Sequence, residues 1–379
     1  MAVVTGYPWY NLSSVPLQFR KGIFKREVTF GVKVVRVRLP LFRSKKLALA
    51  AGHFLSPIAL LLGGLRSPKS DVIYAYSPPL LMGLTGRLIA WRMKAIFVLG
   101  VQDLHPQAYI DQGILRNRIL INIFRSIEKL MYRLSDSITV HSQGNLDYVL
   151  GVVPSKNKAV KVVSNWVNSD QVSPLPRFNS FSRELFLDDK FVVGYAGTIG
   201  ISQGTECIIE AAFSLRGKSG IHFLVVGDGV EKEGLLRRVR DKDLTNISFI
   251  EMQPQEKYPN VVATFDLALV TLNPMVKTPV IPSKIISIMA AERPLIASLP
   301  EGDAAALVRL ADCGLVIPPA DSNELRKAIV QLYENKKLRE RFGRNGRNYV
   351  QANLTSDKAA SILHEIFENT INDSSSSTE

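Results

Sequence analysis

The stretch Pro279–Ser298, PVIPSKIISIMAAERPLIAS, determines how the rest of this chain is interpreted. It combines a polar turn at Pro282-Ser283-Lys284, a short apolar helix over Ile285–Ala291 and a buried strand over Pro294–Ser298. A turn that opens a helix presents backbone N–H groups to anions, and this turn adds a hydroxyl and a positive charge. The same residues are also compatible with an ordinary loop before a helix. Taken by itself, the stretch leaves both interpretations open.

The segments around this stretch alternate between strands and helices. Expected strands are 191–195, 221–226, 247–250, 267–272 and 315–317, and expected helices are 231–240, 258–264, 304–311 and 323–333. Strands that alternate with helices at short spacing predict a parallel, doubly wound sheet. The fold class is therefore α/β.

Two glycine turns lie between strands and helices of this half. The first is Ala196–Gly200 (AGTIG), followed by Ser202-Gln203-Gly204, and the second is Gly227-Asp228-Gly229. Neither fits the pattern GxGxxG, and each is a weak signal alone. Together with the Pro-Ser-Lys turn they predict three strand ends that converge on one phosphate-bearing ligand.

The composition is that of a globular protein. A chain of 379 residues with 46% hydrophobic residues is long enough for two domains. Cys207 and Cys313 lie in apolar segments without metal-binding or redox spacing, so we expect core residues in a reducing compartment. The N-terminus, MAVVTGYPWYN, lacks the basic leader and long apolar core of a cleavable signal.

Positive charge is concentrated in the first half. Residues 1–170 contain 23 Lys and Arg against 8 Asp and Glu, a net charge of +15, whereas the remaining residues sum to −2. This asymmetry predicts a partner with many negative charges, either nucleic acid or an anionic membrane surface. No recognisable nucleic-acid-binding motif accompanies the charge, so nucleic acid ranks low as a partner.

Residues 47–65, LALAAGHFLSPIALLLGGL, form an apolar segment flanked by cations. Its length approaches that of a membrane span, but His53, Ser56, Pro57 and Gly63-Gly64 weaken a spanning helix. A core helix and a helix that lies in the membrane surface are the other two interpretations. The flanking cations slightly favour the surface helix.

The first half is also predicted to contain strands and helices. Expected strands are 2–6, 31–40, 71–76, 95–101, 137–140 and 160–164, and expected helices are 80–91 and 116–134. The second helix is amphipathic. Its basic stripe is Arg118, Arg125, Lys129 and Arg133, and its apolar stripe is Leu120, Ile123, Ile127 and Leu130.

A polar cluster, Gln102–Pro106, directly follows the strand over 95–101. Open α/β sheets bind ligands beyond the carboxyl ends of their strands. Asp103 and His105 are therefore candidates for a general base or a binding pair. The alternatives are that Asp103 is a turn or helix-capping residue and that His105 fills a loop.

Several motifs together resemble a known family. They are NWVN…PLP over 165–176, YAGTIGISQG over 195–204, VVGDG over 225–229, PSKIISIMAAERPLIAS over 282–298 and GRNGRNYV over 343–350. In order and spacing they resemble the GT-B-fold retaining glycosyltransferases of glycosyltransferase family 4. Within that family the chain is most similar to the subgroup of bacterial fucosamine-transferase-like proteins of surface-polysaccharide synthesis. The resemblance extends over nearly the whole chain.

The resemblance implies two Rossmann-like domains whose parallel sheets face each other across a cleft. It divides the chain into an acceptor-binding domain (1–172), a linker (173–185), a nucleotide-sugar-binding domain (186–350), a C-terminal helix that packs back towards the first domain (351–371) and a disordered tail (372–379). The Pro- and Ser-rich sequence SPLPRFNSFS over 173–182 agrees with the linker.

The resemblance also implies roles for individual residues. A UDP-linked sugar donor would contact Gly197, Thr198, Gln203, Gly204, Gly227, Gly229, Gln253, Pro254, Ser283 and Lys284. The acceptor would contact Tyr76 and Ser77, and Asp103 with His105 would be presented to the reacting sugar. The leaving diphosphate could itself accept the proton. No metal or other cofactor is expected, because helix N-termini and basic side chains neutralise the diphosphate.

The chain departs from the family pattern at several places. Pro279 and Ser287 stand where many members carry two glutamates, and Glu292 replaces a glycine. Thr198 and Gln203 stand where Arg and Lys are frequent, which leaves Lys284 as the main cation. Family chains also begin with a further strand, glycine-rich loop and helix, so the N-terminal domain is expected to be incomplete, with exposed strand edges.

These observations lead to one main hypothesis and two alternatives. The main hypothesis is a retaining, metal-independent glycosyltransferase that adds a sugar to a polyprenyl-diphosphate-linked oligosaccharide on the cytoplasmic face of a bacterial plasma membrane, as a peripheral protein. Its product would be O-antigen, capsule or exopolysaccharide. The alternatives are a non-catalytic, degenerate partner subunit and a nucleotide-sugar epimerase, whose chemistry needs carboxylates and a His around the sugar, in which the predicted donor motifs of the C-terminal half are poor.

Overall fold

The computed structural model describes residues 1–7, 19, 21–39, 45–153 and 159–376. The chain forms two compact units. The first, here the N-terminal unit, comprises residues 1–163 and 363–379, and the second, the C-terminal unit, comprises residues 164–362. The sequence predicts an aromatic turn at Tyr7, Trp9 and Tyr10, and of these residues Trp9 and Tyr10 lie outside the described ranges.

The C-terminal unit contains one six-stranded parallel sheet. Its strands are β8 (Phe191–Ala196), β9 (Ile221–Val226), β10 (Ile247–Ile250), β11 (Leu267–Thr271), β12 (Leu295–Ser298) and β13 (Gly314–Ile317). Their order across the sheet is β10-β9-β8-β11-β12-β13. The predicted strands all form within one residue of the expected bounds, and the doubly wound parallel sheet is confirmed.

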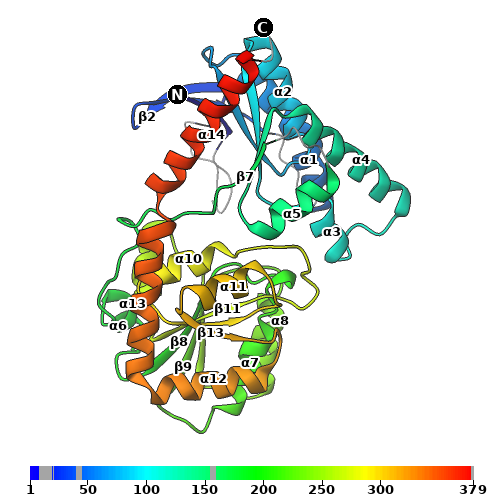
Figure 1. Ribbon diagram of the computed structural model, residues 1–379. Helices are drawn as coiled ribbons and strands as arrows, with labels where there is room; N and C mark the ends of the chain where they lie inside the picture. Colours follow the sequence, from blue (N-terminus) through cyan, green and yellow to red (C-terminus); the bar gives the residue numbers. More distant parts are fainter. Residues whose placement is uncertain (8–18, 20, 40–44, 154–158, 377–379) are drawn as a thin grey trace. The chain divides into compact units, whose positions relative to one another are not determined.

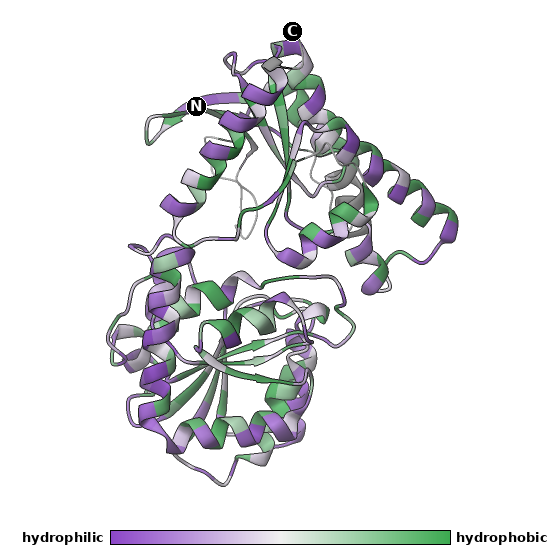
Figure 2. Cartoon of the chain, in the orientation of Figure 1, coloured by the Kyte–Doolittle hydropathy of each residue, from purple (hydrophilic) through white to green (hydrophobic). Residues whose placement is uncertain are grey.

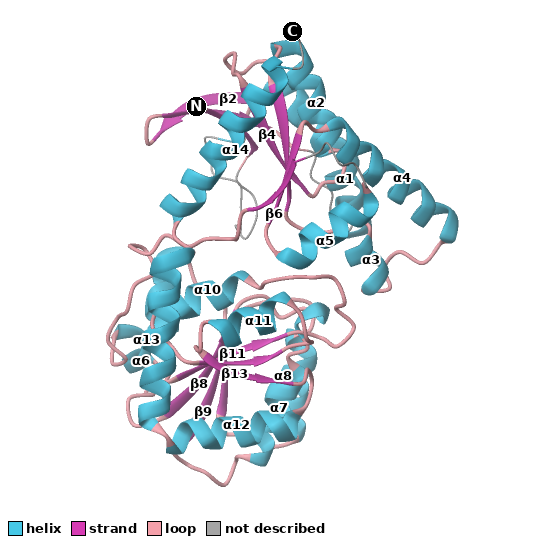
Figure 3. Cartoon of the chain, in the orientation of Figure 1, coloured by secondary structure: helices cyan, strands magenta, loops and turns pink. Residues whose placement is uncertain are grey.

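Helices cover both faces of this sheet (Figure 3). They are α7 (Glu206–Ser214), α8 (Lys232–Asp241), α9 (Tyr258–Ala263), α10 (Ser283–Ala290), α11 (Asp303–Leu310), α12 (Ser322–Glu334) and α13 (Lys336–Asn353), with single 3-10 turns η2 (Ile201–Gln203) and η3 (Gln255–Lys257). Alternate strand residues face opposite sides, so Val192 packs in one core cluster and Val193 in the other. Burial on both faces explains why these strands are apolar almost throughout.

The N-terminal unit has two separate sheets among its described residues. A three-stranded sheet has the order β1-β3-β2, formed by β1 (Ala2–Gly6), β2 (Phe24–Thr29) and β3 (Val32–Val37). A four-stranded parallel sheet has the order β4-β5-β6-β7, formed by β4 (Val72–Ser77), β5 (Ile96–Val101), β6 (Ser137–Val140) and β7 (Ala159–Val162). β2 was not expected from the sequence, and it pairs antiparallel with β3. β1 and β4 each pair with a single neighbouring strand.

The helices of this unit are drawn in Figure 1. They are α1 (Lys45–Gly64), α2 (Met82–Met93), α3 (Gln107–Asp111), α4 (Arg118–Leu134) and α5 (Gln143–Val152). Within the described ranges no helix has both the length and the apolar character to cross a membrane. α1 therefore does not bear out the spanning interpretation of residues 47–65.

The segment predicted to be a linker, 173–185, belongs to the C-terminal unit. It contains the helix α6 (Ser180–Glu184), which Asn179 caps by accepting hydrogen bonds from the N–H groups of Phe181 and Ser182. Arg177 forms an ion pair with Asp266 at 2.9 Å and donates to the Lys190 carbonyl. Such polar residues resemble a linker when only the sequence is considered, because the residue with which Arg177 pairs lies far away in the sequence. The division between the units lies at 163/164, not at 172/173.

The C-terminal helix α14 (Ser356–Ser376) is longer than predicted. Its last residues, 363–376, fall in the N-terminal unit, where the Phe367 ring lies 5.5 Å from the Tyr74 ring. The expected disordered tail from residue 372 is wrong as far as Ser376, and residues 377–379 lie outside the described ranges. No Pro or Gly follows residue 353, and a helix extends readily once it is nucleated.

Candidate functional site

The order of the strands in the C-terminal unit locates the candidate site. The chain reverses its direction of winding between β8 and β11, and in such sheets ligands bind beyond the carboxyl ends of the strands at this point. The loop after β8 and the loop after β11 touch there. The N–H of Asn273 donates to the Ser202 carbonyl at 2.9 Å, and its side-chain amide donates to the Ile201 carbonyl at 3.1 Å.

Lys284 occupies the centre of this region. Its Nζ donates to the Tyr195 hydroxyl at 2.9 Å and to Gln203 Oε1 at 3.0 Å. It also lies 4.1 Å from the centroid of the Tyr195 ring. The Tyr195 hydroxyl in turn donates to the Thr198 carbonyl at 2.7 Å. Lys284, on α10, is therefore fixed against the first glycine turn, where the expected cations are absent from the sequence.

The Lys284 ammonium has no acidic counterpart in the ion pairs found among the described residues. Desolvation by burial lowers the pKa of Lys284 to about 7. The two oxygens that contact Nζ are neutral, so they accept two of its three N–H donors without balancing its charge. An anionic ligand would supply the missing charge, so the geometry favours binding of a phosphate or carboxylate group.

The start of α10 strengthens this preference for anions. The helix begins at Ser283, two residues earlier than predicted, so Ser283 and Lys284 belong to its first turn. Pro282 is the N-cap residue, and no side chain accepts the first N–H groups of the helix. The exposed Ser283 hydroxyl, the open N–H groups and the positive end of the helix dipole accompany the Lys284 ammonium.

The two glycine turns are packed directly against each other. A Cβ atom on Gly227 would lie 1.9 Å from the Gly197 carbonyl oxygen, so only glycine fits at position 227. Gly197 has φ +142°, and a Cβ there would approach Lys284 Nζ to 3.2 Å. The conformation and the close approach both favour glycine at position 197. The structure thus brings together the ends of β8 and β9 and the start of α10, as the sequence predicted.

Most of the predicted donor residues fall within this cluster. Gly197, Thr198, Gln203, Gly204, Gly227, Gly229, Ser283 and Lys284 all lie in the loops after β8 and β9 or in the first turn of α10. Gln253 and Pro254 follow β10, the strand beside β9. Gln253 donates to the Glu251 carbonyl at 3.0 Å, and among described residues no hydrogen bond joins it to the Lys284 cluster. The donor-binding roles of all ten residues stay predictions.

The candidate acceptor and catalytic residues lie in the N-terminal unit. Ser77 ends β4 and pairs with Val101 at the end of β5, so Tyr76 and Ser77 lie at the same sheet edge as Asp103 and His105. Asp103 is exposed, whereas Ser77 and His105 are buried. The His105 ring lies 4.3 Å from the Tyr109 ring. This burial agrees better with a loop-filling His105 than with a His that touches substrate, and Asp103 stays the better candidate.

Sequence reasoning missed two residues of the cluster. Tyr195 is fully buried and was assigned only to a strand, yet its hydroxyl positions Lys284. Burial raises the pKa of Tyr195, so the hydroxyl stays neutral. Asn273 fixes the loop after β8. A polar atom at the end of a buried strand, immediately before a glycine turn, was the available signal for Tyr195.

The departures from the family pattern also have a structural explanation in one case. Glu292 follows α10 with φ +57°, the left-handed conformation that glycine usually adopts after a helix. The glycine of the family pattern is therefore explained by the left-handed backbone conformation at this position. Among the described residues, no three or more His, Cys, Asp or Glu gather in a group that could hold a metal ion. Metal independence stays a prediction.

We expect the affinity for a diphosphate ligand to depend on pH. Below the pKa of about 7 the Lys284 ammonium is already charged, and affinity should be constant. Above it, binding must take up a proton, so affinity should fall by roughly tenfold per pH unit. Titration calorimetry with UDP-glucose between pH 6 and 8.5, in two buffers of different ionisation enthalpy, measures this uptake. A flat profile would contradict the pKa shift.

Comparisons with known proteins agree with this geometry. Residues 177–349 match the family Glycosyl transferases group 1. The chain is 24% identical over 274 residues to the probable glycosyltransferase WbjE of Pseudomonas aeruginosa, covering 71% of this chain and 68% of that protein. It is 26% identical over 302 residues to the putative colanic acid biosynthesis glycosyl transferase WcaI of Escherichia coli (strain K12), covering 76% and 72%.

A solved structure shares the fold. HepE (Alr3699) of Anabaena, crystallised in complex with UDP and glucose, superposes with a TM-score of 0.69 at 16% identity. The match covers 89% of this chain and 86% of that one. At this identity the likeness establishes the fold alone.

Proposed function

We propose that this chain, which is a glycosyltransferase of the GT-B fold with relatives in bacterial polysaccharide biosynthesis, transfers a sugar from a UDP-linked donor to a polyprenyl-diphosphate-linked oligosaccharide. In this proposal the reaction retains the configuration of the sugar and needs no metal. The product is a cell-surface polysaccharide such as O-antigen, capsule or exopolysaccharide. The protein acts as a peripheral protein on the inner face of the plasma membrane.

One observation carries the donor assignment. The ammonium of Lys284, on α10, lies beside the end of β8 and has no acidic partner among the described ion pairs. The diphosphate of a nucleotide-sugar supplies two negative charges, and the N–H groups at the start of α10 can donate hydrogen bonds to its oxygens. This arrangement neutralises a leaving diphosphate with a side chain and a helix terminus. It therefore supports a mechanism in which no metal ion is required.

The choice of uridine rests on a neighbour. HepE, with the same fold, binds UDP together with glucose. Gln253 and Pro254, after β10, are the residues that we assign to the base.

Asp103 is the residue that we assign to the reacting sugar in the N-terminal unit. It is exposed and directly follows the buried strand β5. The leaving diphosphate can accept the acceptor proton, so Asp103 is assigned to orientation of the sugar and not to proton removal. Tyr76, half-exposed at the end of β4, is assigned to the acceptor.

A thermal-shift series with UDP, GDP and ADP, each with EDTA and with Mg²⁺, tests the donor. At 100 times its Kd a ligand stabilises the folded protein by about 2.7 kcal/mol. We expect UDP to give this stabilisation in EDTA, and GDP and ADP to give less. Equal stabilisation by all three would contradict the base assignment, and stabilisation only with Mg²⁺ would contradict metal independence. No stabilisation by any nucleotide would contradict the donor site.

A transfer assay separates the proposal from its alternatives. With a UDP-sugar and a polyprenyl-diphosphate acceptor, a transferase forms a longer lipid-linked product. An epimerase converts the donor without the acceptor, and a non-catalytic subunit does neither. The anomeric configuration of the product, measured by NMR, tests retention.

A further inference from the structure

Three helices of the N-terminal unit form one layer beside its sheets. The Phe54 and Phe124 rings, from α1 and α4, are 6.3 Å apart. Gly64 of α1 packs against Ile89 of α2, where a Cβ would lie 2.2 Å from the Ile89 side chain. Gly83 of α2 packs in the same way against Met131 of α4. Figure 1 shows the three helices on one side of the four-stranded sheet.

Each helix of this layer exposes an apolar stripe on the side away from its buried residues. α2 buries Gly86, Ile89 and Ala90 and exposes residues three and four positions apart. Trp91 of α2 is 77% exposed and Ile119 of α4 is 71% exposed. The exposed apolar residues, which we call the apolar face, are Phe54, Leu55, Ile58 and Leu62 on α1, Leu84, Leu88 and Trp91 on α2, and Ile119, Leu120, Ile123 and Leu130 on α4.

This arrangement corrects the expectation for α4. An amphipathic helix normally turns its apolar stripe to the core. In α4 the core side is formed by Glu128, Met131 and Tyr132, and the apolar stripe is open to solvent. Figure 2 shows hydrophobic and hydrophilic segments alternating along α4. The apolar stripe is thus left for a partner outside the unit.

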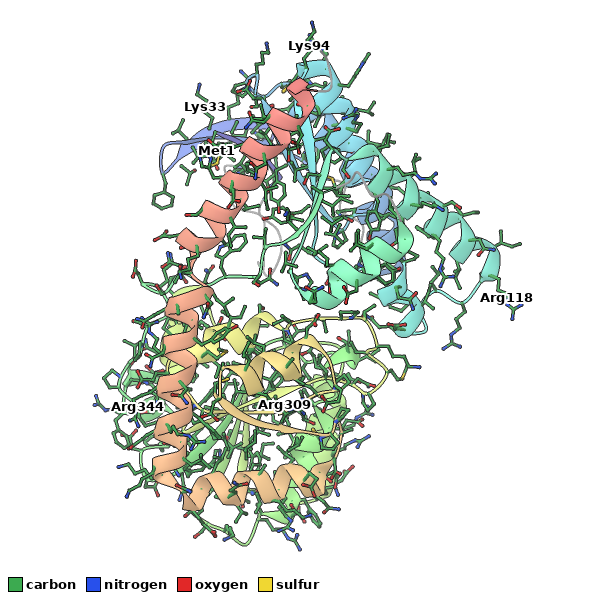
Figure 4. All side chains as sticks on the ribbon, viewed as in Figure 1. Met1, Lys33, Lys94, Arg118, Arg309 and Arg344 are labelled. Atoms are coloured by element: carbon green, nitrogen blue, oxygen red, sulfur yellow. The ribbon has the colours of Figure 1, made fainter. Side chains whose placement is uncertain are left out.

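The charges around the apolar face are mainly positive, and the exposed Asp136 that follows α4 is paired with Arg87 of α2 at 3.0 Å. α1, α2 and α4 contain one acidic residue in their sequences, Glu128, and it is buried. Its carboxylate accepts from the Tyr132 hydroxyl at 3.0 Å. Exposed cations border the face, namely Arg66, Arg92, Lys94, Arg118, Arg125, Lys129 and Arg133. In Figure 4, Lys94 and Arg118 point away from the ends of α2 and α4 into solvent.

An apolar face bordered mainly by cations selects its partner. A second copy of this chain docked through the same face would bring cations against cations, because a two-fold interface pairs a surface with itself. An anionic lipid surface complements the apolar face in two ways. Its acyl chains contact the apolar stripes, and its negative headgroups pair with the bordering Lys and Arg side chains. A Trp at the border suits the water–lipid boundary.

We propose that the apolar face of α1, α2 and α4 lies in the surface of an anionic lipid bilayer, with the bordering cations at the level of the headgroups. The three helices lie in the plane of the surface and do not cross it. The inference deepens the membrane location in the proposed function by naming the surface and the lipid charge. The proposal identifies which surface of the N-terminal unit, the unit assigned to the acceptor, contacts the lipid.

Co-sedimentation of the full chain with lipid vesicles tests the proposal. The protein should bind phosphatidylcholine vesicles that contain phosphatidylglycerol at least tenfold more tightly than phosphatidylcholine alone, and added salt should weaken the binding. The triple variant Trp91→Ser, Ile119→Ser and Ile123→Ser should lose at least tenfold in affinity. The pair Arg118→Gln and Lys129→Gln should lose roughly tenfold and only on anionic vesicles.

Matched controls come from the C-terminal unit. Phe186→Ser, Leu310→Ser and Ile362→Ser remove exposed apolar side chains there, and Lys336→Gln with Arg344→Gln removes exposed cations. Both control variants should bind vesicles as the unmodified chain does. All substituted side chains are exposed, so unfolding temperatures should stay unchanged, which separates lost binding from lost folding.

Three results would overturn the proposal. They are equal binding to neutral and anionic vesicles, unchanged vesicle binding by the triple variant, and a triple variant that only converts a dimer to a monomer. UDP binding is measured on the same samples. A chain that binds UDP but no vesicle refutes the docking face alone, and one that binds vesicles but no nucleotide refutes the donor assignment alone.

Discussion

Replacing Lys284 by Met is expected to abolish measurable sugar transfer and to weaken donor binding by about 2 to 5 kcal/mol, or roughly 30- to 5,000-fold in Kd. This loss of binding free energy is the one expected when one partner is removed from a buried, hydrogen-bonded charge pair. Among the described residues, the ammonium donates hydrogen bonds to the neutral oxygens of Tyr195 and Gln203 and to no carboxylate, so the donor diphosphate would be its first anionic partner there. Isothermal titration with UDP-glucose measures the loss.

The same variant should be at least as stable as the unmodified chain without ligand. Desolvation of the ammonium lowers its pKa to about 7, which means that the folded state disfavours the charge. Met keeps most of the aliphatic volume and removes this penalty. Lost binding together with an equal or higher unfolding temperature is the signature of a ligand-binding lysine. A structural lysine would give lower stability instead.

Lys327→Met is the matched control for this experiment. Lys327 lies on α12 and forms an exposed ion pair with Glu324 at 2.6 Å. Exposed pairs contribute about 0 to 1 kcal/mol, so neither stability nor donor affinity should change appreciably. If the Lys284→Met variant bound the donor with an affinity within threefold of that of the unmodified chain, the phosphate assignment would be refuted.

Replacing Gly227 by Ala is expected to disrupt the same site through the backbone. The added Cβ would lie 1.9 Å from the Gly197 carbonyl oxygen, a contact that cannot exist, and the obstacle is main chain and not a flexible side chain. The turn after β8 must therefore move away from the turn after β9. Such overpacking costs about 1 to 3 kcal/mol of stability. Donor affinity should fall at least tenfold, because Thr198 and Gln203 lie on the displaced turn.

Gly234→Ala provides the control for added volume. Gly234 lies within α8, and no atom lies within 4 Å of a Cβ built there. Alanine favours a helix over glycine by about 1 kcal/mol, so this variant should be slightly stabilised with unchanged donor affinity. Thermal unfolding and UDP-glucose titration of both variants are the measurements. Gly227→Ala with native stability and affinity would show that the two turns are not packed as described.

The C-terminal unit was largely predictable from its sequence. Strands buried on both faces are short, continuous apolar runs, so β8 to β13 could be read directly from the chain. Pro-Ser-Lys after such a strand predicted the start of α10 to within two residues. The glycine turns followed from the same rule. These features are local, because each is encoded within a few consecutive residues.

Other features depended on partners that are distant in sequence. The sequence of residues 173–185 is typical of a linker. The structure shows that Arg177 in this segment pairs with Asp266, which lies 89 residues later in the chain. The C-terminal helix runs through Ser376, although its last residues are polar. The apolar stripe of α4 was evident from periodicity, but periodicity does not say which stripe faces the sheet. The side that the neighbouring helices cover decides that question, and they cover Glu128, Met131 and Tyr132.

The sequence by itself determined an α/β chain with a parallel doubly wound sheet, and it predicted an anion-binding turn at Pro282-Ser283-Lys284. Only the tertiary structure decided which groups the lysine contacts, because its contact with Tyr195 joins residues 89 positions apart through the adjacency of β8 and β11. Hydrophobic periodicity encodes which residues are buried, but strand order decides which polar atoms meet. The same long-range packing leaves the Lys284 ammonium without an acidic partner among the described ion pairs, and that is the property on which the proposed donor site depends.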